Sequence, residues 1–351
     1  MLRFVAFVLA LELAAFAADA VAQITGPTGR TAHGALTVGI RIASAAESGS
    51  AYQTFEASLN TAMRSSTRPR DWALAASGSP NPSRTIGAAT AHFDGDLFRA
   101  AQAAPSDALV QWLVANYGDT GTPEGAARRG AAIEALTRIE PDNGAVWMQA
   151  LNVAAGAGDD HAVDDALARM AEARRFDDHF VDIVHAWIDV YDRHPPPASL
   201  STDAYDAGFV TAFAKAAATA MPAYQAIVNA CKPRAEGSDR AASCTTAGRV
   251  MLERGDTLIA RSIGFAILRN LDAATEADRA AKRNLEWYQA NVLSGTGENG
   301  DARDALAHES DWRRMSDEID VLKSALRRAG LPTEAPEGWN PPSKPQATTT
   351  G

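Results

Sequence analysis

The chain has 351 residues, of which 46% are hydrophobic and 22% are charged, and its formal net charge at pH 7 is −10. This composition is that of a globular protein, long enough for one large or two ordinary domains, and it excludes a chain that is disordered throughout. The acidic balance argues against a nucleic-acid partner, because such binding depends on Lys and Arg side chains that neutralise phosphates.

The N-terminus predicts export. One positive charge precedes an apolar run over residues 4–17, and Ala20-Val21-Ala22 forms an A-x-A cleavage pattern. This is the form of a secretory signal peptide over residues 1–22. An uncleaved anchor is the weaker alternative, because the apolar run is shorter than the roughly 20 residues that span a bilayer. We therefore expect a periplasmic or secreted protein that has no membrane contact after cleavage.

Residues 23–90 predict an N-terminal arm with one or two helices. The first helix is expected over residues 52–64 and a short second one over 71–76. Residues 77–89 contain two Gly and two Pro residues, which are typical of a loop.

Residues 91–330 read as a series of helices with short breaks, and three helix starts in it recur at a fixed spacing. Pro105, Pro141 and Asp177 lie in turn signals, each is 36 residues from the next, and each precedes an apolar stripe. A period of this size is typical of stacked helical pairs, because one pair cannot bury its apolar face alone.

The stretch over residues 132–170 resembles the tetratricopeptide repeat family, whose unit is a helix-turn-helix of 34 residues. The A-I-E-A-L sequence at 132–136, followed by Pro-Asp-Asn at 141–143, is similar to the end of one repeat, and Trp147 and Leu151 to the opening of the next. The usual Gly and Tyr of the first helix are missing. The resemblance is best over residues 105–190, and it implies a degenerate α-solenoid whose concave surface takes a peptide or protein.

Three further helices are expected towards the C-terminus. Two are long, over residues 249–271 and 274–293. The third has its apolar residues three and four apart along one face, and Gly330 follows its end; these residues are Trp312, Met315, Ile319, Leu322 and Leu326. Residues 331–351 are expected to form a Pro-rich disordered tail that is attached at Trp339. The predicted fold class is all-α, with stacked helical hairpins in a tetratricopeptide-like solenoid or an irregular helical bundle.

Two cysteines, Cys231 and Cys244, enclose a polar stretch. In an oxidising compartment we expect them to form a disulfide. Two free buried thiols are the alternative, and a redox or metal role would require a spacing that the chain lacks.

One predicted helix face gathers carboxylates and a histidine. At 100° per residue, five side chains fall within about 80° of one another; they are Asp178, Asp182, His185, Asp189 and Asp192. The simplest interpretation is a solvated acidic face, and the others are a partner-binding surface or a site for metal-assisted or acid–base chemistry.

Other motifs favour structure over chemistry. Residues 295–300 match G-x-G-x-x-G but follow a predicted helix, whereas a dinucleotide site follows a strand. Residues 252–256, with Arg261 beyond them, could form ion pairs between helices or a buried charge network. The aromatic residues Trp112, Trp147 and Trp187 fit core packing better than a row for ligand stacking.

No nucleophile or metalloprotease motif occurs in the chain. We therefore predict a noncatalytic, exported interaction or assembly module of the cell envelope, without a cofactor or metal site, whose partner is a protein or peptide. The alternative is a metal-assisted hydrolase that acts through the acidic and histidine face. The sequence does not decide the oligomeric state.

Overall fold

The computed structural model describes residues 45–77, 88–118, 121–198, 207–219, 222–233, 239–293 and 309–341. All regular secondary structure in these ranges is helical, and the only β-type pairing in them is two isolated bridges. The predicted all-α fold class is confirmed. No helix in the described ranges has the length and apolar character needed to cross a bilayer. The predicted signal peptide and the 295–300 motif lie outside the described residues.

The first seven helices of the described residues follow one another in packed pairs. Helix α3 packs against α4, α5 against α6, and α7 against α8, while α2 packs against α3. Their bounds are α2 Ala45–Ser65, α3 Pro69–Ser77, α4 Ala88–Ala103, α5 Ala108–Tyr117, α6 Pro123–Ile139, α7 Gly144–Ala157 and α8 Asp160–Glu172. The helices predicted at 52–64 and 71–76 correspond to α2 and α3.

Side-chain caps explain why four of these helices begin where they do. In α5, α6, α7 and α8, the residue before the helix accepts a hydrogen bond from a backbone N–H of the first turn, which otherwise has no partner. The four capping residues are Asp107, Thr122, Asn143 and Asp159.

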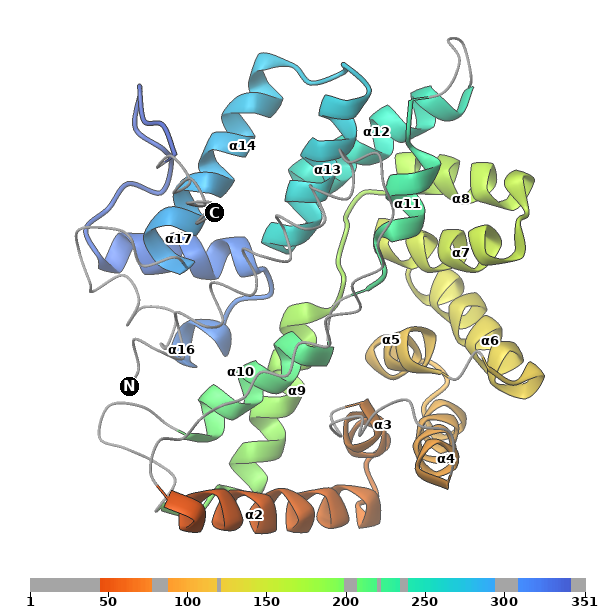
Figure 1. Cartoon of the computed structure of the whole chain (residues 1–351), viewed down its shortest axis with the longest axis vertical. Coiled ribbons are helices and arrows are strands. Elements are labelled where there is room, and N and C mark those ends of the chain that lie inside the picture. Colours follow the sequence, from red (N-terminus) through yellow and green to blue (C-terminus); the bar gives the residue numbers. More distant parts are fainter. Residues whose placement is uncertain are drawn as a thin grey trace, which may run out of the picture.

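The order of packing changes after α8. Helix α8 packs against α12 (Asp239–Arg254), whereas α9 (Phe180–Arg193) packs against α10 (Ala207–Thr219). In Figure 1 the row α3 to α8, α12 and α13 follows an arc, and α9 and α10 lie inside it. The third predicted helix start therefore leads to a helix that leaves the row, and the side-by-side order in the chain ends at α8.

Two helices predicted as continuous are broken. Residues 249–271 divide into α12 and α13 (Leu258–Asn270), and residues 312–326 divide into α16 (Glu309–Trp312) and α17 (Glu318–Arg328). Thr257 and Asp317 each cap the second helix through the side chain. The apolar periodicity was right for both segments, but it did not reveal these internal caps.

The remaining elements complete the C-terminal part. They are α11 (Gln225–Ala230), α14 (Glu276–Tyr288) and a π-helical turn, η2 (Gln289–Leu293). Beyond α17 the chain is described to residue 341, and it lies on α14: Trp287 donates to Pro332 O at 2.9 Å, and the Trp339 ring is 5.3 Å from the Trp287 ring. The predicted disordered tail is therefore in contact with the fold over its first part.

Two hydrophobic clusters form the core. The larger extends from α2 to α13, reaches Trp312 of α16 and Val321 of α17, and includes Trp112 and Trp187, which are 0% and 2% exposed. The smaller joins α13, α14, η2 and α17 around Trp287. The predicted core role of Trp112 and Trp187 is confirmed, whereas Trp147 is half-buried and donates to Pro141 O.

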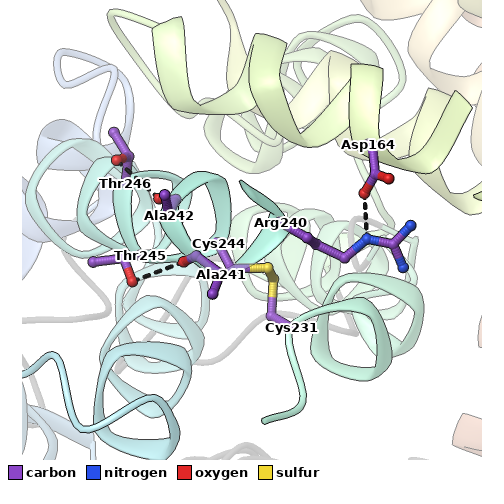
Figure 2. The surroundings of a disulfide bond; sticks show 8 residues. All are labelled: Asp164, Cys231, Arg240, Ala241, Ala242, Cys244, Thr245 and Thr246. Carbon is purple, nitrogen blue, oxygen red and sulfur yellow. Dashed lines mark hydrogen bonds and ion pairs between the residues drawn. A yellow bond between two sulfur atoms is a disulfide. The ribbon is translucent and has the colours of Figure 1, made fainter. Parts of the chain in front are cut away.

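The predicted disulfide between Cys231 and Cys244 is present (Figure 2). It joins the end of α11 to α12, with the two Cα atoms 5.5 Å apart. Beside it, Arg240 of α12 pairs with Asp164 of α8, which fixes α12 against α8.

Candidate functional site

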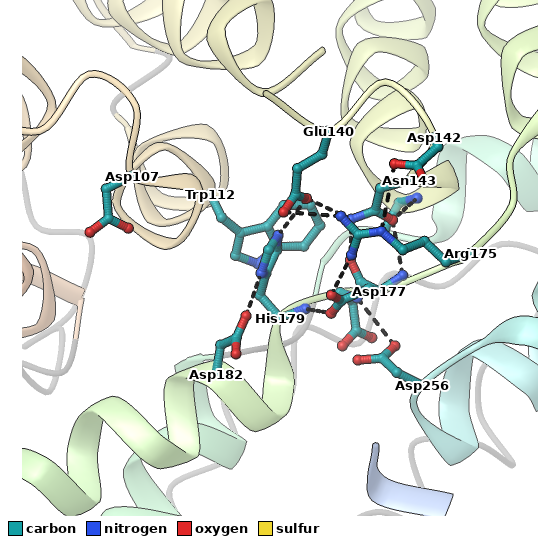
Figure 3. Close-up of polar contacts among 12 residues, drawn as sticks. Asp107, Trp112, Glu140, Asp142, Asn143, Arg175, Asp177, His179, Asp182 and Asp256 are labelled. Carbon is teal, nitrogen blue, oxygen red and sulfur yellow. Dashed lines mark hydrogen bonds and ion pairs between the residues drawn. The ribbon is translucent and has the colours of Figure 1, made fainter. Parts of the chain in front are cut away.

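The densest polar cluster surrounds the segment between α8 and α9, residues 174–179 (Figure 3). This segment is held on both sides by backbone hydrogen bonds. Gly144 N donates to Arg175 O at 2.9 Å, Phe176 N donates to Arg254 O at 3.2 Å, and Asp256 N donates to Phe176 O at 3.0 Å. We call the cluster, formed by residues 140–144, 174–182 and 254–258 with Tyr224 and Glu318, the polar junction.

Asn143 is the uncharged centre of one side of the junction. Asn143 is fully buried, with 0% of the residue exposed. The side-chain oxygen accepts from Ala145 N at 3.1 Å and Asp177 N at 2.9 Å, and the amide nitrogen donates to Glu140 and to Asp177 O, each at 2.9 Å. One side chain therefore caps α7 and fixes the position of the segment before α9.

His179 lies directly before α9 with a left-handed backbone, φ 59° and ψ 19°. Its ring is 2% exposed and lies 5.1 Å from the Trp112 ring. Nδ1 is 2.9 Å from an Asp182 oxygen, and Nε2 is 3.1 Å from a Glu140 oxygen. A histidine between two carboxylates donates through both nitrogens only when it is protonated.

The electrostatics of this histidine agree with its contacts. Burial alone lowers the pKa of His179, but hydrogen bonds to Asp182 and Glu140 outweigh it and raise the pKa to about 10. Burial raises the pKa of Glu140, yet the contacts with His179 and Asn143 and the charge of Arg175 bring it down to about 2. The pair is therefore an imidazolium and a carboxylate at neutral pH.

The other side of the junction holds three buried acids. Asp178, Asp256 and Glu318 are 4%, 6% and 9% exposed. Burial raises the pKa of Asp178 to about 6 and of Glu318 to about 7, and raises the pKa of Asp256 well above its usual range. Asp178 accepts hydrogen bonds from the hydroxyls of Tyr224 at 2.8 Å and Thr257 at 2.9 Å, which favour its ionised form.

The structure does not bring the five predicted site residues together as one exposed face. Asp178 was predicted to share that face, but this is wrong: it precedes α9 and is buried in the junction. Asp182 pairs with His179. Asp189 pairs with Arg68 and Arg193, Asp192 pairs with Arg313, and His185 contacts the carbonyl oxygen of Trp312. These four side chains connect α9 to neighbouring segments.

A metal ion is a further chemical possibility for Asp177, His179 and Asp182, whose potential donor atoms lie within 4.8 Å of one another. The donor set does not fit it well. A ligating histidine must be neutral at the bonding nitrogen, whereas both nitrogens of His179 face carboxylates. Asp177 also accepts a hydrogen bond from the Arg175 guanidinium at 2.6 Å, so its carboxylate is already paired with a positively charged side chain.

The sequence did not single out Asn143, Glu140, His179 or Asp256 as site residues. For Asp256 a signal existed, because residues 252–256 suggested either ion pairs between helices or a buried charge network. Asp256 is buried and forms no ion pair among the described residues, Arg254 donates to Ala173 O, and Arg261 pairs with Asp317, as an ion pair between segments.

Comparisons with family models, with curated proteins and with solved structures find no match to the chain. The site is therefore interpreted from its own geometry.

Proposed function

We propose that the protein is a noncatalytic, exported interaction or assembly module of the cell envelope. The proposal rests on one observation, which is how the polar side chains of the junction and of α9 are paired. Their charged groups bind one another across separate elements, as His179 binds Glu140 and Asp192 binds Arg313. Such contacts stabilise a scaffold, whereas a catalytic acid or base must face its substrate.

Export is part of the proposal and rests on the sequence of residues 1–22 together with the disulfide. A disulfide persists in oxidising compartments and is rare in the cytosol. The Cys231–Cys244 bond is therefore compatible with a protein that acts outside the cytosol.

The helix row offers a candidate surface for a protein or peptide partner. Among the described residues, the exposed large apolar side chains are Ile139 at the end of α6 and Val153 on α7, which are 36% and 42% exposed. They belong to the part of the chain that resembles tetratricopeptide repeats, a family that binds peptides through stacked helices. Exposed apolar side chains on such helices are suited to a partner contact.

A photo-crosslinking amino acid at position 153 of the full exported chain tests the proposal. We expect the same protein to be captured in cells from position 153 and from position 139, and the Ile139→Asp variant to reduce capture from position 153. Gln102, which is exposed on α4, is the matched control position. Equal capture from all three positions would contradict the proposal.

Metal analysis of protein purified without a chelator separates the proposal from the metal-assisted hydrolase. We expect no stoichiometric zinc, manganese or calcium. A stoichiometric metal that is lost in the Asp182→Asn and His185→Ala variants would favour the hydrolase.

A further inference from the structure

We propose that the Asp256 carboxyl group binds a proton at neutral pH and donates it to Asp177 in a hydrogen bond that closes the polar junction. The junction would then loosen when this proton is lost. The inference concerns a conformational device of the fold and does not depend on the proposed function.

Three neighbouring acids differ in the hydrogen-bond donors that surround them. The Asp178 carboxylate accepts hydrogen bonds from Phe180 N at 3.2 Å and from the hydroxyls of Tyr224 and Thr257. Asp177 receives His179 N at 2.8 Å and the Arg175 guanidinium at 2.6 Å. Both carboxylates therefore accept hydrogen bonds that stabilise the ionised form.

Asp256 lacks such support. Its Oδ1 accepts only Asp178 N, at 3.2 Å, and its Oδ2 is buried without any hydrogen-bond partner. The residue is 6% exposed. An orphaned, buried carboxylate oxygen is costly, and the cost is avoided when the oxygen carries a proton and becomes a donor.

Asp177 is the acceptor for that proton. Burial and the charges of Asp178 and Asp177 raise the pKa of Asp256, and a proton shared with the Asp177 side chain acts in the same direction. In Figure 3 the Asp256 carboxyl group lies beside the segment that carries Asp177, and a backbone hydrogen bond from Asp178 N joins the two. Neighbouring carboxylates in a cluster with little solvent cannot both remain ionised at low cost, so one shared proton is favoured.

The surrounding elements supply no competing cation to Asp256 among the described residues. From residues 174–179, Arg175 binds Asp177 and His179 faces Glu140 and Asp182. Arg254 at the end of α12 donates to a backbone carbonyl, and Arg261 of α13 donates to Gly255 O and lies 3.7 Å from Asp317. Before α11 the facing group is Tyr224, and from α17 it is the buried Glu318, which also titrates.

Loss of the proton would affect the fold because the backbone of Asp256 forms hydrogen bonds with two other segments. Asp256 N donates to Phe176 O, and Glu318 N donates to Asp256 O, both at 3.0 Å. A negative charge on Asp256 therefore arises where the segment before α9, the start of α13 and the start of α17 meet. These elements also connect the larger hydrophobic cluster to the smaller one.

The sign of the pH dependence follows from the raised pKa. A buried acid whose folded pKa exceeds its unfolded pKa of about 3.9 gives stability that is complete at low pH and is lost as pH rises through the folded pKa. Asp178, Glu318 and His179, whose pKa values are also raised, act in the same direction. We therefore expect the protein to become less stable between pH 5 and pH 8.5.

The test compares the full chain with its Asp256→Asn variant, in which an amide N–H replaces the proposed acid O–H. Urea unfolding is measured from pH 5 to pH 8.5. For each proton bound more tightly by the folded state, the wild-type unfolding constant rises up to tenfold per pH unit above pH 5. In Asp256→Asn, the part of this rise that comes from the Asp256 proton should be absent. The variant should also be more stable than wild type at pH 8.5. Asp320→Asn, at an exposed position on α17, should keep the wild-type slope.

A direct readout covers the case in which the variant does not fold. Carboxyl carbon NMR of the wild-type protein at pH 7 should show a protonated aspartate that is absent from the Asp256→Asn or Asp256→Ala spectrum. If every aspartate is ionised at pH 7, or if Asp256→Asn keeps the full wild-type slope, the proposal is wrong. It is also overturned if calcium chloride stabilises the wild type at pH 8 and leaves Asp256→Asn unchanged, because the site would then bind a cation.

Discussion

At His179, burial and hydrogen bonding act on the same proton in opposite directions. Burial disfavours the imidazolium, while the carboxylates of Asp182 and Glu140 favour it more strongly and raise the pKa to about 10. The folded state therefore binds this proton more tightly than the unfolded chain, whose histidine pKa is about 6.5. The resulting stability is complete below about pH 6.5 and is lost as pH rises through about 10.

The His179→Ala variant should lose about 3 kcal/mol of unfolding free energy at pH 7, because the mostly buried Glu140 carboxylate loses one of its two cationic partners and keeps only Arg175. The variant should also lose less stability than wild type as pH rises from 6.5 to 10, because the His179 proton no longer contributes. Urea unfolding over this range measures both effects. His161→Ala is the control, since the His161–Asp165 pair is exposed to solvent. An equal loss in the two variants would show that the buried contacts contribute nothing.

Residue types alone could not have predicted this part of the site. Asp177 lies in a predicted turn signal, and its side chain does accept a backbone N–H, from His179. The helix nevertheless begins only at Phe180, because His179 adopts the left-handed conformation and directs its ring towards Trp112. A positive φ at a histidine is uncommon, and no local pattern predicts it.

At the scale of elements, the contact between α12 and α13 depends on two glycines. A Cβ atom on Gly264 would lie 2.5 Å from Gly248 O and 2.6 Å from Leu252 N. These distances are far below van der Waals contact, and the obstructing atoms are backbone. Any side chain at position 264 would therefore force the two helices apart.

The Gly264→Ala variant should be destabilised by about 2 kcal/mol, a typical effect of overpacking in a core. Gly130→Ala is the matched control, because a Cβ atom there meets nothing within 4 Å. That change should stabilise the protein by about 0.5–1 kcal/mol, since alanine has the higher helix propensity. Thermal or urea unfolding of both variants measures the difference. Two changes of the same sign would contradict the close approach of α12 and α13.

Most helices could be predicted from the sequence, but several of their ends could not. Apolar periodicity located α2, α3 and α14, since it reflects the face that each helix buries. It failed between α12 and α13, where Gly255 ends one helix and Thr257 caps the next without interrupting the apolar pattern. A Cβ atom on Gly255 would lie 2.5 Å from Met251 O, so this glycine is required by the tight end of α12.

At the scale of the whole molecule, the helix row and the polar junction stabilise the fold through different kinds of contact. The row buries apolar faces between neighbours, whereas the junction joins segments that are far apart in the sequence, such as Asp178 and Thr257. Contacts of this range leave no periodic signal in a single sequence. For that reason the sequence predicted an exposed stripe on α9 and missed the buried partners of Asp178.

The central claim is that the polar junction is one cooperative structural unit. Hydrogen exchange with mass spectrometry tests it most directly, in wild type and in an Asn143→Ala variant, because Asn143 joins two of the three segments through uncharged hydrogen bonds. We predict faster exchange in the variant over residues 140–146, 174–182 and 254–258 together, with little change in α2. Faster exchange confined to residues 140–146 would contradict the claim.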